Sequence, residues 1–219
     1  MISEITLENL LPEVFAADPA TSRVADSQIW RTTLNLGRGA DVLVAAESGT
    51  GKSSLCSFLY GIRTDYRGRI LFDGEDIARF SRSHWCCLRT RALAWLPQEM
   101  RLFPELSALD NIMIKNRLTD RLSGSEIMQM MEALEIDHKA ASAAGLLSVG
   151  QQQRVAIIRA VAQPFDFLIL DEPVSHLDER NNRAVAVLVG ARARAEGAAV
   201  IATSVGNHLL LDSPTLLKL

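Results

Sequence analysis

Apolar residues recur along this chain with two periods, one typical of strands and one typical of helices. Short apolar runs bounded by turn residues predict strands, and residues 5–10 and 32–36 alternate like strands at an exposed edge. Apolar stripes at every third or fourth position predict helices, one of which Gly197 ends. The predicted strands are residues 5–10, 32–36, 41–46, 69–72, 92–96, 165–170 and 198–203, and the clearest predicted helices are residues 52–60, 125–134, 151–162 and 180–196.

The order of these elements predicts an α/β fold with a mostly parallel sheet. Strands alternate with helices in both halves of the chain, and such an alternation covers both faces of a parallel sheet with helices. Between residues 106 and 162 the pattern is almost entirely helical. We therefore expect a single domain over residues 1–219, with a core formed by residues 1–97 and 164–219 and a helical subdomain formed by residues 98–163.

Composition excludes several classes of protein. Of the 219 residues, 48% are hydrophobic and 22% are charged, which is an ordinary balance for a globular domain. The formal net charge is −3 and the arginines are interleaved with acids, so the chain lacks the basic surface of a nucleic-acid-binding protein. No apolar run approaches the roughly 20 residues that a membrane helix needs, and the N-terminus lacks a secretory signal pattern. We expect a cytoplasmic protein that binds no nucleic acid and reaches a membrane through a partner.

A loop between a predicted strand and a predicted helix has the composition of a phosphate-binding loop. From Ala46 to Ser53 it reads A-E-S-G-T-G-K-S, which matches G-x-x-x-x-G-K-[ST] except that Ala46 replaces the first glycine. The glycines let backbone N–H groups point at phosphate oxygens, while Lys52 adds a positive charge and Ser53 a hydroxyl for Mg²⁺. A plain glycine-rich turn is the weaker alternative. The candidate nucleotide-binding residues in this loop are Ser48, Gly49, Thr50, Gly51, Lys52, Ser53 and Ser54.

Two acids follow the predicted strand at residues 165–170. The apolar run F-L-I-L leads directly into Asp171 and Glu172. Carboxylates at the end of a buried strand are costly unless a cation or water meets them. Asp171 is placed to hold Mg²⁺ and Glu172 to polarise an attacking water. Alone, a strand end entering solvent would be the simpler interpretation, but together with the phosphate loop the pair predicts a catalytic site.

Three further motifs, in a fixed order, resemble those of the ABC ATPase family. Gln98 in L-P-Q resembles the Q-loop glutamine, residues 147–154 (L-S-V-G-Q-Q-Q-R) resemble the signature, and Asp178 in S-H-L-D matches the D-loop. The resemblance covers nearly the whole chain and is closest to small ATPases of the lipoprotein-release and macrolide-exporter type, through residues 102–111. It implies a P-loop NTPase with a RecA-like core and mixed sheet, N-terminal antiparallel strands and an inserted α-helical subdomain.

The resemblance also implies how the motifs cooperate. Helix-opening residues Ser148, Val149, Gly150 and Gln151 would face the γ-phosphate of an ATP held by a second protomer. Gln98 would sense that phosphate together with Mg²⁺, and so would be both a catalytic residue with Glu172 and a metal ligand with Ser53 and Asp171. The surface around residues 101–111 would contact a separate membrane subunit. The working unit would be a homodimer, or a heterodimer with a second ABC ATPase.

Two residues expected from the resemblance are in question. For the aromatic residue that stacks on adenine, Phe15 is the candidate, with a core phenylalanine as an equal alternative and Trp30 as a weaker one. Where family members carry a histidine that contacts the γ-phosphate, this chain has Val205 or, after a slip of one residue, Ser204. His208 lies three residues too late. Because losing one transition-state donor typically costs roughly 10²–10³ in rate, we expect weakened hydrolysis of ATP.

Two functions remain open from the sequence. In the first, the chain is the ATP-hydrolysing subunit of an ABC transporter and drives a separate permease-type membrane subunit. In the second, it is a nucleotide-gated regulatory module with weak hydrolysis that controls a membrane partner. Glu172 favours the first, and the absent histidine favours the second. Both require ATP and Mg²⁺, and both place the protein on the inner face of the cell membrane through its partner.

Overall fold

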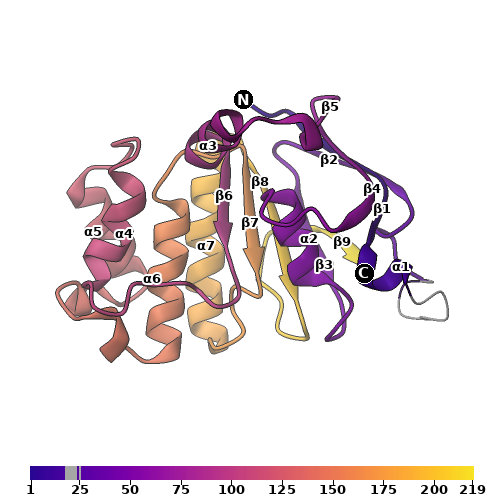
Figure 1. The fold of residues 1–219 in the computed structure, drawn as a ribbon. Coiled ribbons are helices and arrows are strands. Elements are labelled where there is room, and N and C mark those ends of the chain that lie inside the picture. Colours follow the sequence, from indigo (N-terminus) through magenta and orange to yellow (C-terminus); the bar gives the residue numbers. More distant parts are fainter. Residues whose placement is uncertain (18–23, 25) are drawn as a thin grey trace.

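A computed structural model describes residues 1–17, 24 and 26–219, and Figure 1 shows their arrangement. The strands are β1 (Glu4–Pro12), β2 (Thr33–Gly37), β3 (Asp41–Ala45), β4 (Tyr66–Phe72), β5 (Glu75–Asp76), β6 (Leu93–Leu96), β7 (Phe167–Asp171), β8 (Ala199–Ser204) and β9 (Thr215–Lys218). The α-helices are α1 (Glu13–Ala16), α2 (Lys52–Leu59), α3 (Arg82–Arg91), α4 (Ala108–Asn116), α5 (Gly124–Ala133), α6 (Val149–Val161) and α7 (Glu179–Glu196). Short 3₁₀ turns are η2 (Ile77–Arg79), η3 (Asp137–Lys139) and η4 (Ala144–Leu146).

The central sheet has five strands in the order β6-β7-β8-β3-β9, and its pairings are all parallel. Its register places Asp171 of β7 beside Thr203 of β8, and Ala45 of β3 beside Ser204. The carboxyl ends of these three strands therefore meet at one edge of the sheet. Ligands of open α/β folds bind at that edge, and here the loop that follows β3 lies on it.

A second sheet, in the order β2-β1-β4-β5, is antiparallel and lies at the opposite end of the molecule from helices α4 and α5 (Figure 1). The expected α/β class with N-terminal antiparallel strands and a helical region is confirmed. The central sheet is parallel where a mixed one was expected, because the antiparallel strands form their own sheet. β1 is also interior, between β2 and β4, although its alternation suggested an exposed edge.

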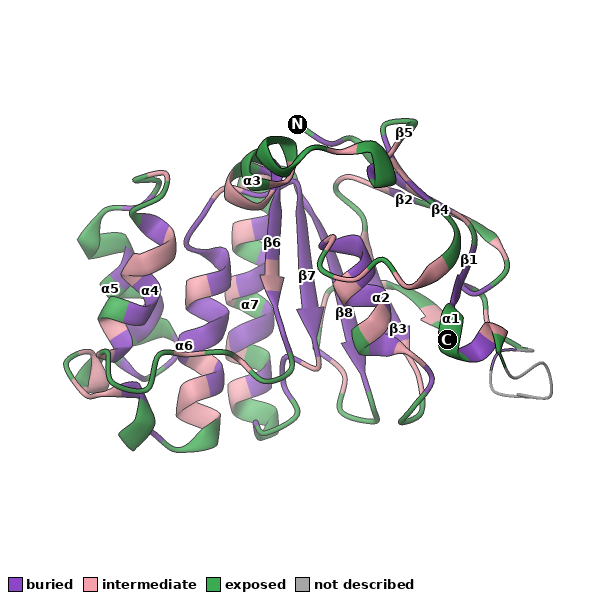
Figure 2. Ribbon diagram, viewed as in Figure 1, coloured by how far each residue is buried: buried purple, intermediate pink, exposed green. Residues whose placement is uncertain are grey.

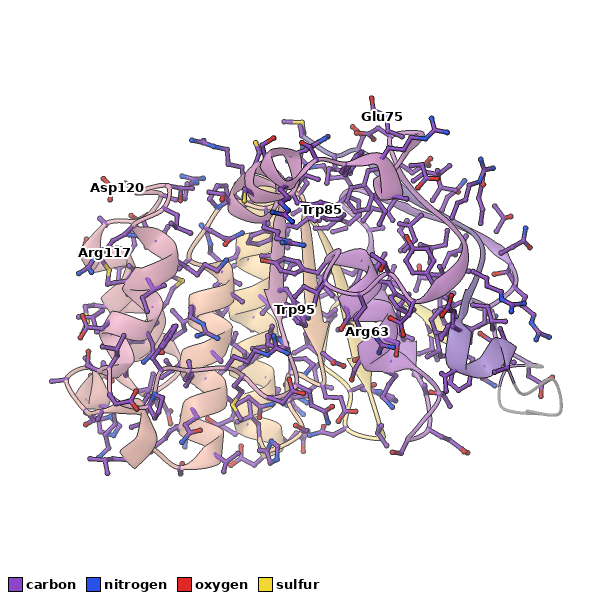
Figure 3. All side chains as sticks on the ribbon, in the orientation of Figure 1. Arg63, Glu75, Trp85, Trp95, Arg117 and Asp120 are labelled. Atoms are coloured by element: carbon purple, nitrogen blue, oxygen red, sulfur yellow. The ribbon has the colours of Figure 1, made fainter. Side chains whose placement is uncertain are left out.

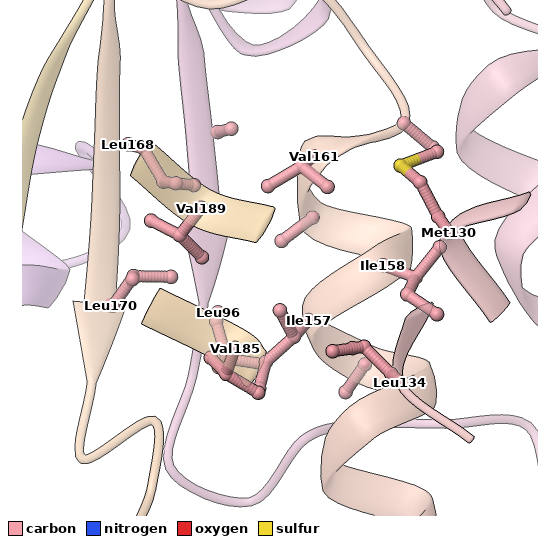
Figure 4. Close-up of a cluster of buried hydrophobic side chains, with 14 of the residues drawn as sticks. Leu96, Met130, Leu134, Ile157, Ile158, Val161, Leu168, Leu170, Val185 and Val189 are labelled. Atoms are coloured by element: carbon pink, nitrogen blue, oxygen red, sulfur yellow. The ribbon is translucent and has the colours of Figure 1, made fainter. Parts of the chain in front are cut away.

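Two hydrophobic cores lie on the two faces of the parallel sheet. Along β7, Leu168 and Leu170 pack against helices α4 to α7, while Phe167 and Ile169 pack against α2 and the antiparallel sheet. Strand side chains alternate between faces, so a strand buried on both faces is apolar throughout. Figure 2 shows the buried strands in the middle of the molecule, and Figure 4 shows the side chains that α5, α6 and α7 contribute on one face.

The helices between β6 and β7 begin at serine residues that follow turns. Ser107, Ser123 and Ser148 are the N-caps of α4, α5 and α6, and each hydroxyl accepts a hydrogen bond from a backbone N–H of the first turn. Helix α4 packs closely on α6, and both contribute apolar residues to the core on that face of the sheet. Among the residues that the structure describes, none of the helices combines the length and apolar character that crossing a membrane requires.

Candidate phosphate-binding site

The phosphate loop, defined as residues 46–53, leaves the end of β3 and enters α2 in a conformation that glycine permits. Gly49 has φ 81° and Gly51 has φ 99°, values in the left-handed region that favours glycine. The Lys52 side chain is 5% exposed, and its Nζ donates a 2.8 Å hydrogen bond to the carbonyl oxygen of Glu47. The loop thus curls around its own lysine, which places the ammonium group at the open N-terminus of α2.

Two aromatic rings support this loop from beneath. A Cβ added at Gly51 would lie 3.1 Å from a ring atom of Phe15 and 3.1 Å from one of Trp30. Trp30 also donates a 3.0 Å hydrogen bond from Nε1 to the carbonyl oxygen of Thr50. Trp30 is 1% exposed and therefore supports the loop backbone, a role that the sequence did not reveal. Phe15 is 8% exposed and belongs to the same core, so stacking of Phe15 on adenine stays a prediction.

Ser53, Gln98 and Asp171 form the candidate Mg²⁺ site. The Ser53 hydroxyl lies 3.4 Å from Oε1 of Gln98, and both residues are exposed. Asp171 is 2% exposed and accepts a 2.8 Å hydrogen bond at Oδ1 from the Thr203 hydroxyl, which leaves Oδ2 for another partner. Burial, and then the charge of the nearby Asp171, raise the pKa of the Cys56 thiol in α2.

The oxygen ligands of these three residues suit Mg²⁺ better than a group of several carboxylates would. Over the described part of the chain, no three His, Cys, Asp or Glu side chains gather to hold a metal by themselves. Mg²⁺ usually takes one or two carboxylates together with substrate phosphates and waters. A hydroxyl, an amide oxygen and one buried carboxylate match that requirement, so Ser53, Gln98 and Asp171 suit a metal that arrives with a nucleotide.

Glu172 stands next to the phosphate loop through an ion pair. Its Oε1 lies 3.7 Å from Nζ of Lys52, and its φ of 51° turns the backbone sharply at the end of β7. The Glu172 carbonyl oxygen accepts a 3.1 Å hydrogen bond from Nε2 of Gln153. The sequence related the loop lysine and this acid only through the order of their motifs. The structure brings the two side chains together.

The signature residues begin α6. Ser148 and Gln151 exchange hydrogen bonds in a capping box, 3.3 Å from the Gln151 N–H to the Ser148 hydroxyl and 2.9 Å from the Ser148 N–H to Oε1 of Gln151. Val149 is 48% exposed although it is apolar. A Cβ on Gly150 would lie 3.2 Å from the carbonyl oxygen of His176, so the helix start packs tightly on the D-loop. Whether this end faces a second protomer stays a prediction.

Gln153, which the sequence did not single out, joins the signature helix to the other motifs. It is 2% exposed, donates to the Glu172 carbonyl and accepts a 3.1 Å hydrogen bond at Oε1 from the His176 N–H. A buried polar side chain between two loops fixes their spacing, because leaving it unpaired is costly. One signal was available, since the polar Gln153 occupies a buried position of the helix.

Asp178 is the N-cap of α7. Its Oδ1 accepts a 2.8 Å hydrogen bond from the Asn181 N–H, and this bond is the main reason that the pKa of Asp178 is lowered. Ser54 is engaged within the chain, since its hydroxyl accepts a 2.8 Å hydrogen bond from Nη1 of Arg63. The roles of Asp178 in the D-loop and of Ser54 in nucleotide binding stay predictions.

The segment after β8 contains both candidate histidine positions. Ser204 is 1% exposed at the end of the strand, and Val205 is 46% exposed just beyond it. Neither offers an imidazole. The ring of His208 nevertheless returns to this point, with Nδ1 2.5 Å from the Ser204 hydroxyl oxygen.

Comparisons with known proteins agree with this geometry. The profile of the family described as ABC transporter matches residues 30–175. The dimeric structure of MJ0796, a bacterial ABC transporter cassette, is 23% identical and has a TM-score of 0.75, with 91% of this chain and 87% of that chain covered. The dimeric post-hydrolysis state of MJ0796 bound to ADP and Pi is 22% identical with a TM-score of 0.76, covering 93% and 88%. A bacterial Atm1-family ABC exporter with ATP bound is 25% identical with a TM-score of 0.73, covering 93% of this chain and 35% of that chain.

Proposed function

This chain belongs to the ABC transporter family as an ATP-binding cassette, and from that membership we propose that two such cassettes close on Mg-ATP to drive a separate membrane subunit. The single observation that carries the proposal is the meeting of Lys52 and Glu172, with 3.7 Å between Nζ and Oε1, at the carboxyl edge of the sheet. A terminal phosphate bound to the loop would replace Glu172 as the ion-pair partner of Lys52. Glu172 would then be free to polarise the attacking water.

The remaining residues of the site bind the nucleotide and Mg²⁺ or respond to their presence. The backbone N–H groups of residues 48–53 hold the phosphates at the N-terminus of α2. Ser53, Gln98 and Asp171 hold Mg²⁺, which neutralises charge on the phosphate oxygens. Gln98 follows β6 directly, so a change at the Ser53–Gln98 contact would reach the helical region. We propose that residues 98–163 move as a subdomain against residues 1–97 and 164–219.

A second copy or a second ABC ATPase would complete each site. The exposed first turn of α6 carries free backbone N–H groups and the positive end of the helix dipole, which suit a phosphate held by another protomer. The structures of MJ0796 are dimers, one of them with ADP and Pi, and this supports the same arrangement here. A heterodimer remains an alternative, because Ala46 and Val149 depart from the family motifs.

A groove beside the helical subdomain is the proposed contact for the membrane subunit. It is lined by Tyr60, Trp95, Arg101, Phe103, Lys115 and Arg159. Phe103 is 52% exposed, and Nε1 of Trp95 is buried without a hydrogen-bond partner among the described residues. Figure 3 shows Trp95 on β6, between α2 and the helical subdomain.

The charge of this groove indicates what would dock there. Burial lowers the pKa of Lys115 and of Arg159, and the charge of Arg159 lowers that of Lys115 further. An acidic side chain on an apolar helix would offset this repulsion and cover Phe103. We propose that such a segment of the membrane partner holds the protein at the inner face of the cell membrane. The lipoprotein-release and macrolide-exporter ATPases remain the proposed subfamily.

A regulatory module with weak hydrolysis is the second candidate function. The observation that favours it is the absence of an imidazole at Val205 and Ser204, the positions where a γ-phosphate contact was expected. Under this function ATP binding would switch the membrane partner and turnover would be slow. The two candidates are distinguished by measuring whether movement of the transported substrate depends on ATP hydrolysis or on ATP binding alone.

Purified protein tests the proposal through two measurements, Mg-ATP binding and ATP hydrolysis, on one set of variants. Wild type should bind Mg-ATP and hydrolyse it; Glu172→Gln should keep binding and lose turnover; Lys52→Ala should lose binding because the phosphates lose their charge partner. Glu179→Gln, at the exposed start of α7, is the matched control for removing a carboxylate and should change neither property. Unaltered affinity for Mg-ATP in Lys52→Ala would sink the proposal.

A further inference from the structure

We propose that Arg159 of α6 positions Gln98, by holding the strained turn that follows Gln98 in the chain. The inference rests on the proposed function, because it names a further residue on which the Mg²⁺ site depends. Arg159 acts through the backbone rather than on the nucleotide, so it is a positioning residue. The proposal stands on two successive left-handed residues, on a guanidinium group that bonds both of them, and on the weak support that Gln98 receives through its own side chain.

The side chain of Gln98 has little to hold it in place. It is exposed, and within the described part of the chain its only hydrogen bond is the 3.4 Å contact with the Ser53 hydroxyl, which is long for such a bond. A ligand of Mg²⁺ must be placed closely, because this ion demands near-ideal octahedral geometry. The backbone on both sides of Gln98 must therefore supply the precision. Pro97, with its fixed φ, supplies it on one side only.

On the other side of Gln98 the chain makes a turn that residues other than glycine avoid. Met100 has φ 58° and Arg101 has φ 50°, so both lie in the left-handed region although both carry a Cβ. The Cβ makes this conformation unfavourable, and residues other than glycine adopt it singly more often than in succession. Strained backbone of this kind persists only where the surrounding structure holds it. The turn therefore needs a support outside itself.

The guanidinium group of Arg159 provides that support. Its Nη1 donates a 2.8 Å hydrogen bond to the carbonyl oxygen of Arg101, and its Nη2 donates to the carbonyl oxygen of Met100. Successive left-handed residues direct their carbonyl groups to one side, as in a turn of left-handed helix, and a planar guanidinium can meet both oxygens at once. Arg159 is half-buried near the end of α6, so the helix fixes the position of both donors.

The other contacts of the turn are weaker. Glu99 and Arg101 form an ion pair at 3.8 Å, but both side chains are exposed, and such pairs contribute little. The Arg101 guanidinium also lies 5.4 Å from the centre of the Trp95 ring. The Met100 N–H donates a 2.9 Å hydrogen bond to the Pro97 carbonyl oxygen, which does not fix rotation about the N–Cα bond of Met100. Without the two donors from α6 the turn should relax and displace the glutamine before it.

Replacing Arg159 with methionine tests this role, because methionine keeps an unbranched side chain and removes the donors. Arg159→Met should raise the Mg²⁺ concentration for half-maximal ATP turnover about 10-fold and lower kcat about 10-fold, as losing the support of a metal ligand typically does. ATP binding without Mg²⁺ should stay within about twofold, because Lys52 and the loop amides are unchanged, and this result also establishes that the variant is folded. Arg159→Lys keeps the charge but lacks the planar pair of donors, so it should recover little.

Arg89→Met is the matched control. Arg89 also donates to two successive carbonyl oxygens, those of Tyr60 at 3.2 Å and Gly61 at 2.7 Å, but these lie at the end of α2 away from the phosphate loop. Its loss should lower the midpoint of urea unfolding as Arg159→Met does and leave the Mg²⁺ requirement unchanged. Arg101→Gly added to Arg159→Met removes one Cβ that disfavours the turn, so the double variant should need less Mg²⁺ than Arg159→Met alone.

Amide hydrogen exchange of residues 98–102, measured without nucleotide, gives a readout that does not depend on ATP. Exchange should be at least about tenfold faster in Arg159→Met than in wild type or Arg89→Met, because the turn opens more often once its donors are gone. Either an unchanged exchange rate or an unchanged Mg²⁺ requirement in Arg159→Met would overturn the inference while the proposed function stands. If instead Lys52→Ala binds ATP normally, the proposed function itself fails.

Discussion

At the scale of single residues, the candidate site depends on polar side chains that hold the reacting groups in place. Thr203 is the clearest case. Its hydroxyl donates to Oδ1 of Asp171 at 2.8 Å, and it accepts from the Glu172 N–H at 3.2 Å. Thr203 is fully buried. One hydroxyl therefore sets the positions of the acid proposed to bind Mg²⁺ and of the acid proposed to act in catalysis.

Replacing Thr203 with valine should damage the site without changing its volume. Thr203→Val deprives a buried carboxylate oxygen of its partner, which should lower the free energy of unfolding by roughly 1–3 kcal/mol, and it should raise the Mg²⁺ concentration needed for turnover. Thr203→Ser keeps the hydroxyl and serves as the control. Urea unfolding and a Mg²⁺ titration of ATPase activity measure the two effects. Serine and valine variants that behave alike would mean that the hydroxyl is unimportant.

Local motifs predicted the residues that would bind phosphate, but no motif revealed the residues that support them through tertiary contacts. Lys52 and Glu172 were evident because each follows a buried strand within a recognisable pattern. Trp30 bonds Thr50, and Gln153 bonds Glu172, across 20 and 19 residues of sequence. His208 lies three residues beyond the expected position in the sequence, whereas the turn at Gly206 brings its ring back to Ser204. Spacing in sequence does not reveal such a turn unless the positive φ is anticipated.

At the scale of elements, α5 and α6 offer matched tests of what a helix start does. Ser123 and Ser148 are both N-caps with complete capping boxes, at 3.2 Å and 3.3 Å from the hydroxyl oxygen to the third N–H. Only the start of α6 carries the signature. α5 lies at the end of the molecule away from the phosphate loop (Figure 1). Their serines therefore separate the contribution of a cap to stability from its contribution to function.

We expect Ser148→Ala and Ser123→Ala to destabilise the protein alike and to differ in activity. Losing an N-cap costs roughly 0.5–2 kcal/mol, so both variants should show a similar drop in the free energy of unfolding. Only Ser148→Ala should also reduce ATP-dependent dimer formation and turnover, because its helix start would face the phosphate of another protomer. Chemical denaturation and ATPase rates measure these effects. Equal loss of activity in both variants would assign Ser148 a purely structural role.

Elements were predictable where burial imposed a pattern. The strands β3, β7 and β8 are buried on both faces, and their apolar runs predicted them within about two residues. Helix α3 escaped prediction because Leu88 is its only buried residue and five of its ten positions are Arg, Ser or His. Strand β9 escaped because it is a short edge strand with mostly exposed residues. Both are held by neighbouring strands and helices more than by their own periodicity.

At the scale of the whole molecule, the nucleotide site and the signature lie on separate elements of one chain. The phosphate loop belongs to the core between the two sheets, whereas Val149 begins α6, on the other face of the parallel sheet. An apolar side chain that is 48% exposed at a helix start suits an interface better than solvent. If a second protomer covers it, closure on ATP would join two surfaces that a single chain leaves apart.

A charge at this position tests that arrangement while sparing the fold. Val149→Glu places an acid in the first turn of α6, where the helix dipole favours it by about 0.3–1 kcal/mol, so the folded protomer should be as stable as the parent. The same carboxylate would face the terminal phosphate of the opposing ATP, and repulsion between the two anions should prevent dimer formation. In the Glu172→Gln background, sedimentation velocity should show an ATP-dependent dimer that Val149→Glu abolishes. Val187→Glu, at a position of α7 that is 69% exposed, should leave the dimer intact. A dimer that survives Val149→Glu would place the signature away from the partner's nucleotide, because burying an acid against a phosphate is costly.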